Sequence, residues 1–178
     1  MTVDMPPLLQ SFVRQDIRSW SRDVLEVPNP HLGGMKACPY AEAAWRNDKV
    51  DVVVGNSIPC LKDAIKKFNP KEKDILIWVN FNLNKYERWD RWVNLWNERH
   101  RVSDMHLMLF HPDFPPSEDT EEFLTDNDWE SDIEEDYMMI FVQSLSFLNK
   151  ASVALEGSGY YNYFSDDLFQ SLVEVRRS

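Results

Sequence analysis

The stretch "GGMKACPYAEAAW", residues 33–45, places a cysteine directly before a proline and an alanine-rich segment. Proline favours the first turn of a helix, so Cys38 is predicted to cap a short helix that begins at Pro39. Free backbone N–H groups and the helix dipole would favour the thiolate there and lower the pKa of the thiol, and Lys36 adds a positive charge. Cys38 is therefore a candidate nucleophile or redox thiol. The alternative is a half-buried, inert packing residue.

Two residues just beyond a predicted strand could assist such a thiol. His111 follows the strand predicted at residues 105–110, and Asp113 lies two positions further on. Because ligands gather at strand ends in open α/β sheets, Cys38, His111 and Asp113 could act as nucleophile, base and orienting acid. A turn histidine without a catalytic role is the alternative. Together with His31 these residues offer ligand types that suit zinc or iron, but no pair has a dedicated metal-binding spacing, so no metal site is predicted.

The remaining cysteine and histidines are predicted to be structural. Cys60 lies on the apolar face of a helix, and without a Cys-x-x-Cys motif a two-thiol mechanism within one motif is excluded. His106 falls inside a strand, where it would pack or face a partner. His100 ends a helix and would cap its last carbonyl groups.

Alternating helices and strands must position these side chains. Strands are predicted at residues 50–54, 75–81 and 105–110, and residues 137–142 fit either a fourth strand or the front of a helix. Helices are predicted at residues 8–24, 39–47, 59–68, 84–101, 144–156 and 165–176. This order predicts an α/β or α+β fold, in which helices pack on a sheet of three to four strands, as a single domain over residues 1–178.

Charge is distributed unevenly along the chain. The net charge is -11, which argues against nucleic acid and anionic membranes as partners. No Lys or Arg occurs between Arg101 and Lys150, whereas the stretch from Asp113 to Asp136 carries twelve acidic residues. We predict a solvated acidic loop or lid at about residues 113–136, which could engage a basic protein.

Two other patterns suggest ligands and are better explained otherwise. Acidic residues alternate from Asp126 to Glu130, but Ser131 stands where an EF-hand needs glycine and Tyr137 where it needs glutamate. Three tryptophans between residues 89 and 96 could stack on sugar rings, yet their helical spacing favours core packing. The sequence has no Gly-rich phosphate loop, G-x-S-x-G or H-E-x-x-H motif, so it points to no particular cofactor.

The composition is that of a globular chain, with 43% hydrophobic and 28% charged residues among 178. No apolar run approaches the roughly 20 residues that span a bilayer, and the first residues lack the pattern of a secretory signal. Two cysteines are too few for a disulfide scaffold, which favours a reduced, cytoplasmic protein.

Two short motifs carry a resemblance to known proteins. "CPYA" at residues 38–41, the strand "VDVVV" shortly after it, and "FHPDF" at residues 110–114 follow one another in that order. In this they resemble a family of small bacterial proteins of unknown function that carry Cys-Pro-Phe-Ala and Phe-His-Pro-Asp motifs. The resemblance covers roughly residues 30–115 and implies no established activity. "CPYA" is also similar to the active-site start of omega-class glutathione transferases, where the cysteine directly follows a strand, whereas residues 28–34 predict a loop.

Two hypotheses from different classes follow. The first is a small enzyme that uses an activated Cys38 thiol, assisted by His111, in nucleophilic or redox chemistry on a small molecule. The second is a non-catalytic binding or adaptor protein that engages a basic partner through the acidic segment at residues 113–136. The distance between Cys38 and His111 and the pKa of the thiol would separate them.

Overall fold

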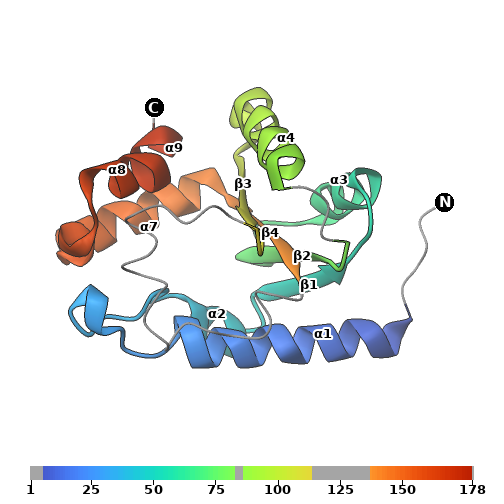
Figure 1. Ribbon diagram of the computed structural model, residues 1–178, viewed down its shortest axis with the longest axis horizontal. Helices are drawn as coiled ribbons and strands as arrows, with labels where there is room; N and C mark the ends of the chain where they lie inside the picture. The colour runs from blue at the N-terminus through green and yellow to red at the C-terminus, as the bar shows by residue number, and fades with distance from the viewer. Residues whose placement is uncertain (1–5, 83–85, 114–136, 178) are drawn as a thin grey trace.

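Four strands form one mixed sheet in the computed structural model, which describes residues 6–82, 86–113 and 137–177 (Figure 1). The order is β1-β2-β4-β3, with β1 (Val50–Val54) parallel to β2 (Ile75–Asn80). Strand β4 (Met138–Ser144) runs antiparallel to both β2 and β3 (Met105–Phe110). The predicted single-domain α+β fold is confirmed, and the undecided stretch at residues 137–142 belongs to strand β4 from Met138 onward.

The strand sequences reflect their places in the sheet. The edge strand β1 alternates between buried and half-buried residues, whereas the central strands "ILIWVN" and "MMIFVQS" are buried almost throughout. A strand covered on both faces needs a continuous apolar run, because both sets of side chains enter a core. The two cores lie on opposite faces of the sheet, and residues of β4 alternate between them.

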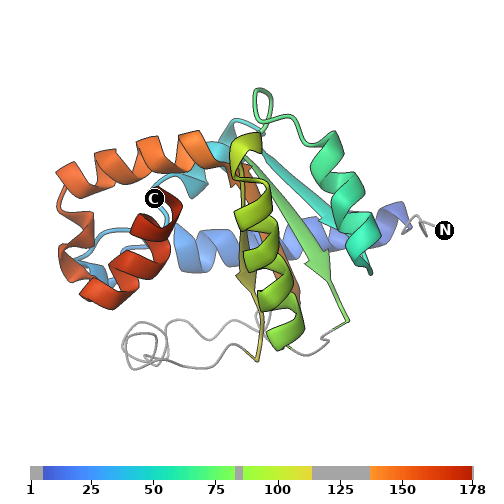
Figure 2. The same ribbon diagram turned by 90° about the horizontal axis from the view of Figure 1, so that it is seen from above.

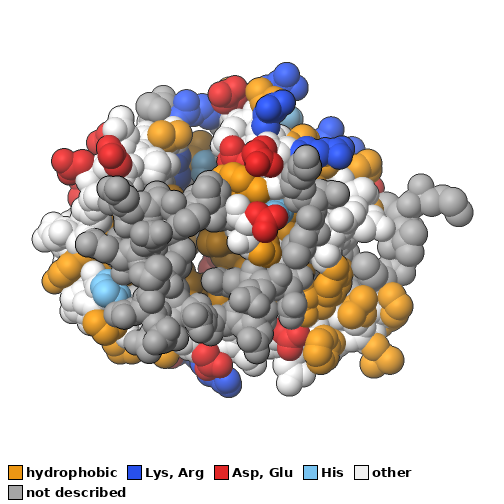
Figure 3. All heavy atoms as spheres, in the orientation of Figure 1, with side chains coloured by type: hydrophobic (Ala, Val, Ile, Leu, Met, Phe, Trp, Pro, Cys, Tyr) orange, Lys and Arg blue, Asp and Glu red, His pale blue; other side chains and the backbone are white. Residues whose placement is uncertain are grey.

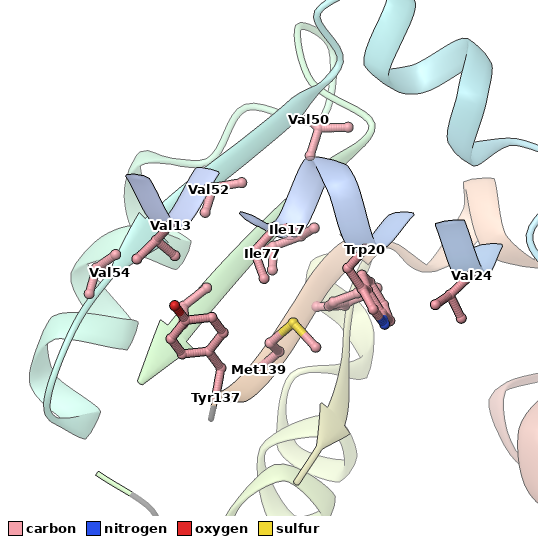
Figure 4. Packing of buried hydrophobic residues seen from close by; sticks show 12 residues of the cluster. Val13, Ile17, Trp20, Val24, Val50, Val52, Val54, Ile77, Tyr137 and Met139 are labelled. Carbon is pink, nitrogen blue, oxygen red and sulfur yellow. The ribbon is translucent and has the colours of Figure 1, made fainter. Parts of the chain in front are cut away.

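Helix α1 (Pro7–Trp20) covers one face of the sheet and continues as a π-helical turn at Ser21–Leu25. Pro7 occupies its first turn, and Val13, Ile17 and Trp20 are buried at helical spacing against the valines of β1 and the inward residues of β2 and β4 (Figure 4). The predicted amphipathic helix at residues 8–24 is therefore confirmed, with a change of helix type near its end.

Helices α3 (Ile58–Lys67) and α4 (Tyr86–Arg99) cover the opposite face (Figure 1). Trp89, Val93 and Trp96 of α4 are buried there, and the Trp89 ring lies 5.6 Å from that of Trp78 on β2. Trp89 and Trp96 are therefore core residues, as their helical spacing predicted, and Trp92 is half-buried against the same core.

The C-terminal residues form a helical arm beside the sheet (Figure 2). It consists of α7 (Leu145–Gly157), a 3₁₀ turn at Tyr160–Tyr163, α8 (Asp166–Phe169), a π-helical turn at Gln170–Glu174 and α9 (Val175–Arg177). Ser144 and Ser165 accept backbone N–H groups as N-caps of α7 and α8, and Gly159 adopts the left-handed conformation with φ +78°. Both predicted C-terminal helices are confirmed. Among the described residues, no helix is long and apolar enough to cross a bilayer.

Candidate functional site

Cys38 lies in the loop that precedes helix α2 (Ala41–Arg46). The N-cap position of α2 is Tyr40, and the Ala41 N–H donates to the Cys38 carbonyl at 3.2 Å, which closes a turn before the helix begins. The Cys38 N–H itself donates to the Leu25 carbonyl at 3.0 Å. The prediction of Cys38 as the helix cap is therefore wrong by two residues, because Pro39 starts a turn and not the helix.

Two opposing influences set the pKa of the Cys38 thiol. Burial of the sulfur has the larger effect and raises the pKa, and the carboxylate of Glu26 acts in the same direction. Backbone N–H groups of Tyr40 and Ala41 favour the thiolate, as the sequence predicted, but they do not outweigh burial. The pKa is raised, which is opposite to the lowering expected for an activated thiol. Lys36, the predicted source of positive charge, pairs instead with Glu42 at 2.6 Å.

The polar groups around Cys38 connect elements of the fold. Glu26 is buried, pairs with Arg18 and accepts the Ser21 hydroxyl at 2.8 Å. The Tyr160 hydroxyl donates to the Ala37 carbonyl at 2.6 Å, which joins the C-terminal arm to this loop. These groups are satisfied by one another, which is the pattern of a structural junction.

His111 lies just beyond β3 with its side chain fully buried. The Asp113 backbone N–H donates to His111 Nδ1 at 3.0 Å, and the Tyr86 ring lies 5.8 Å away, edge-on. Because Nδ1 accepts a hydrogen bond, the neutral ring carries its proton on Nε2. A triad acid requires the opposite tautomer, in which Nδ1–H donates to the carboxylate and Nε2 is the base. The Asp113 carboxylate, 4.0 Å from Nδ1, is therefore not placed as an orienting acid.

The structure brings His111 and Asp113 together. Cys38 bonds to Leu25 and is influenced by Glu26, Tyr40, Ala41 and Tyr160. The contacts of His111 include the Tyr86 ring and the Asp113 N–H. His31 lies in a 3₁₀ turn, where its N–H donates to Asn29 Oδ1 at 2.8 Å. Over the described ranges, no group of three or more His, Cys, Asp or Glu residues is arranged to hold a metal ion. The pairing of Cys38 with His111 stays a prediction.

The other cysteine and histidine near helix ends have structural partners. The Ser57 hydroxyl contacts Cys60 Sγ at 3.1 Å in the first turn of α3. His100 Nδ1 lies 2.9 Å from the Trp96 carbonyl, and its ring stacks on the indole of Trp96 with centroids 4.3 Å apart. The predicted capping role of His100 is confirmed.

Both ends of the acidic segment adjoin the sheet. β3 leads to Asp113, β4 begins at Met138, and Phe110 is paired with Met139 across these two neighbouring strands. At the second end, the Tyr137 hydroxyl donates to Asp16 of α1 at 3.1 Å. The predicted acidic loop or lid itself falls at residues 114–136, outside the described residues.

A cluster that sequence reasoning missed lies between β3 and the C-terminal arm. It contains His106, Arg101 and Arg176, and Arg176 Nη2 donates to Ser152 Oγ of α7. No motif spacing could have revealed this cluster, because its members are up to 75 residues apart in a chain of 178. The available signal was a histidine inside a strand, which the sequence assigned to packing or to a partner.

Comparison with known proteins gives no relative: family models, curated proteins and solved structures all lack a match to this chain.

Proposed function

We propose that this protein is a non-catalytic binding or adaptor protein that engages a basic partner through its acidic segment, residues 113–136. One observation carries the proposal: twelve carboxylates fall in this segment, and no Lys or Arg occurs between Arg101 and Lys150 to neutralise them. The rest of the chain is close to neutral, so the excess negative charge is concentrated at one place. Such a concentration steers basic partners and speeds their association.

The described residues at both ends of the segment support this proposal. The Asp113 N–H donates to His111 Nδ1. The Tyr137 hydroxyl donates to the Asp16 carboxylate, and the centroids of the Tyr137 and Phe81 rings lie 5.1 Å apart. The sheet therefore fixes Asp113 and Tyr137, the two described residues that flank residues 114–136. The raised pKa of Cys38 removes the main physical argument for the competing enzyme hypothesis.

A basic peptide tests the proposal directly. A fluorescein-labelled lysine-rich peptide is titrated with the intact protein, and anisotropy gives Kd at about 0.05 M and about 0.3 M salt. We expect about tenfold weaker binding at the higher salt, because added ions screen exposed charges. The triple variant Asp126→Asn, Asp128→Asn, Glu130→Gln should weaken binding by a similar factor at low salt.

A matched variant separates the segment from the overall charge. Asp63→Asn, Glu98→Gln and Glu174→Gln neutralise three exposed carboxylates on helical elements elsewhere in the molecule. This control should bind the peptide within about twofold of the unmodified protein, because it leaves every carboxylate of the acidic segment in place. Equal losses in both variants, or binding that salt does not change, would contradict the proposal.

The second candidate function is a small enzyme with Cys38 as nucleophile. The observation in its favour is that the N–H groups of Tyr40 and Ala41 act on the thiol in the direction of the thiolate. Catalysis would require this effect to exceed the effect of burial in the substrate-bound protein. The rate at which iodoacetamide alkylates Cys38 in the free protein tests which of the two effects prevails before a substrate binds.

A further inference from the structure

An open hollow lies between the first turn of α3 and the outer side of α4. Its volume is about 460 Å³, and it is lined by Ile58, Glu87, Arg88, Arg91, Trp92 and Leu95. Pockets that take small ligands measure about 300–1,000 Å³, so the hollow is large enough to hold a side chain of a partner. All of its lining residues are exposed or half-buried. A partner can therefore reach it from solvent.

The apolar part of this hollow is held in place by the core beneath it. Ile58 and Trp92 are half-buried and pack against the core under α3 and α4. The Trp92 ring meets the ring of the buried Trp89 edge-on, with centroids 6.2 Å apart. Leu95, three residues after Trp92, is 40% exposed. A single exposed leucine is ordinary, but this one adjoins a fixed tryptophan in a concave site, which is where interfaces place their anchors.

Two arginines flank the apolar part of the hollow. Arg88 and Arg91 are exposed and lie three residues apart on the same side of α4. Among the described residues, neither guanidinium pairs with a carboxylate. Glu87 is the one acidic residue among those that line the hollow, so the lining carries a net positive charge. Figure 3 shows Lys and Arg side chains gathered over α4 and toward α3.

The positive charge continues along α3. Lys62 and Lys66 follow Ile58 at intervals of four residues, which places them on the side of α3 that borders the hollow. Both are exposed and, within the described part of the chain, form no ion pair. With Lys67 they outnumber Asp63, the one acidic residue of this helix. In a chain with a net charge of -11, this surface is therefore a local excess of positive charge.

We propose that this hollow binds an acidic peptide segment of a separate partner protein. An apolar side chain of the segment contacts Ile58, Trp92 and Leu95, and carboxylates on either side of it pair with Arg88 and Arg91. A guanidinium presents paired N–H donors that match a carboxylate, so two of them beside an apolar site recognise an apolar residue flanked by acidic ones. A nucleic acid fits less well, because the net charge of the chain opposes a long phosphate backbone.

Fluorescence anisotropy of a short labelled peptide, in which glutamates flank a Leu-Phe pair, tests the charge contacts with the intact protein. The double variant Arg88→Gln, Arg91→Gln should bind the peptide about tenfold more weakly at low salt, because it removes both partners of the carboxylates. The matched double variant Lys67→Gln, Arg99→Gln makes the same charge change at the C-terminal ends of the same two helices and should stay within about twofold. Equal losses in both double variants, or no binding to the unmodified protein, would overturn the proposal.

The apolar contact is tested separately. Leu95→Ser should weaken binding by about threefold or more, because it removes apolar area from the hollow. Val102→Ser, at a residue outside the hollow that is 99% exposed, should leave the affinity unchanged. A peptide with two serines in place of its Leu-Phe pair, which leaves the protein unaltered, should also bind more weakly. Equal affinity for the two peptides would overturn the assignment of the apolar site.

Other occupants of the hollow give different results. Self-association in sedimentation experiments that Arg88→Gln, Arg91→Gln abolishes would identify a second copy of this chain as the occupant and overturn the choice of a separate partner. Tighter binding of a labelled oligothymidylate than of the acidic peptide, lost in the same variant, would overturn it in favour of a nucleic acid. The lysine-rich peptide that tests the acidic segment should be unaffected by this variant, so failure of the proposed function and failure of this proposal are distinguishable.

Discussion

At the scale of single residues, nearby and distant parts of the sequence act on the pKa of the Cys38 thiol in opposite directions. The proline after it does bring backbone N–H groups of Tyr40 and Ala41 to bear on the thiol, as the local sequence predicts. The burial that raises its pKa comes from outside the motif, since the Cys38 N–H bonds to Leu25 and the Tyr160 hydroxyl bonds to the next carbonyl along the chain. No motif of four residues contains that information.

Alkylation of Cys38 should therefore be slow. In a Cys60→Ser background, the rate of reaction with iodoacetamide is measured from pH 6 to pH 10 and compared with a cysteine peptide. The midpoint of the rate profile should lie above that of the peptide, because only the thiolate reacts and burial disfavours it. A midpoint below that of the peptide would restore Cys38 as a candidate nucleophile and contradict the electrostatics described above.

At the scale of elements, α1 is specified by the spacing of its apolar residues. Ile17 is fully buried, whereas Phe12 on the same helix is 59% exposed. Ile17→Ala should lower the free energy of unfolding by about 2–5 kcal/mol, because it leaves a cavity against the sheet. Phe12→Ala should change it by about 0.5 kcal/mol or less. Urea denaturation measures both, and similar losses would show that α1 does not pack as described.

On the edge strand β3, an asparagine side chain makes backbone hydrogen bonds of the kind that a further strand would make. Asn97 of α4 donates to the Leu107 carbonyl at 2.9 Å and accepts the Leu107 N–H at 2.8 Å. Asn97→Ala should cost about 1–3 kcal/mol of stability, because it leaves two backbone groups of a buried residue unpaired. Asn94→Ala, which removes only an exposed contact with Asp90, is the matched control and should cost about 0.5 kcal/mol or less. Equal effects would argue against this capping role.

The elements were predictable to the extent that their signals are local. Helical periodicity identified α1 and α4, and the β-branched run "VDVVV" identified β1 with its observed ends. Residues 137–142 stayed undecided because "YMMIFV" suits a buried helix or a buried strand. The decision comes from pairing with β2 on one side and β3 on the other. The burial of His106 and the contacts of Cys38 with Leu25 and of Ala37 with Tyr160 depend on the same kind of long-range placement.

At the scale of the whole molecule, two regions of opposite charge dominate. The acidic segment accounts for the net charge of the chain, while Arg101 and Arg176, which donate to the Val175 carbonyl and the Ser152 hydroxyl, place positive charge at the C-terminal arm. Asp104, directly before β3, links the sheet to α7. Its carboxylate accepts from the Ser144 hydroxyl at 2.8 Å and from the Ser146 N–H at 2.7 Å. Burial opposes ionisation of Asp104, but these hydrogen bonds prevail and its pKa is lowered.

Acid should destabilise the protein through His106 in a defined window. In the folded protein the pKa of His106 is about 4, below the ordinary value of 6.5. Between pH 6.5 and pH 4 the imidazole is therefore protonated in the unfolded chain and neutral in the folded protein. Stability is therefore lost as the pH falls from 6.5 to 4, by an amount on the order of 2 kcal/mol for a ring that keeps some solvent contact. The contribution of Asp104 persists until the pH falls below its ordinary pKa, which is 3.8.

The free energy of unfolding by urea, measured at several pH values between 7 and 4.5 in a buffer free of phosphate and sulfate, isolates this contribution. His106→Gln should lose less stability than the unmodified protein across that range, because glutamine binds no proton in either state. At pH 7, where the folded ring is neutral, comparison of the two proteins gives the cost of the substitution itself. Parallel pH profiles would contradict the lowered pKa of His106 and the burial that is its main cause.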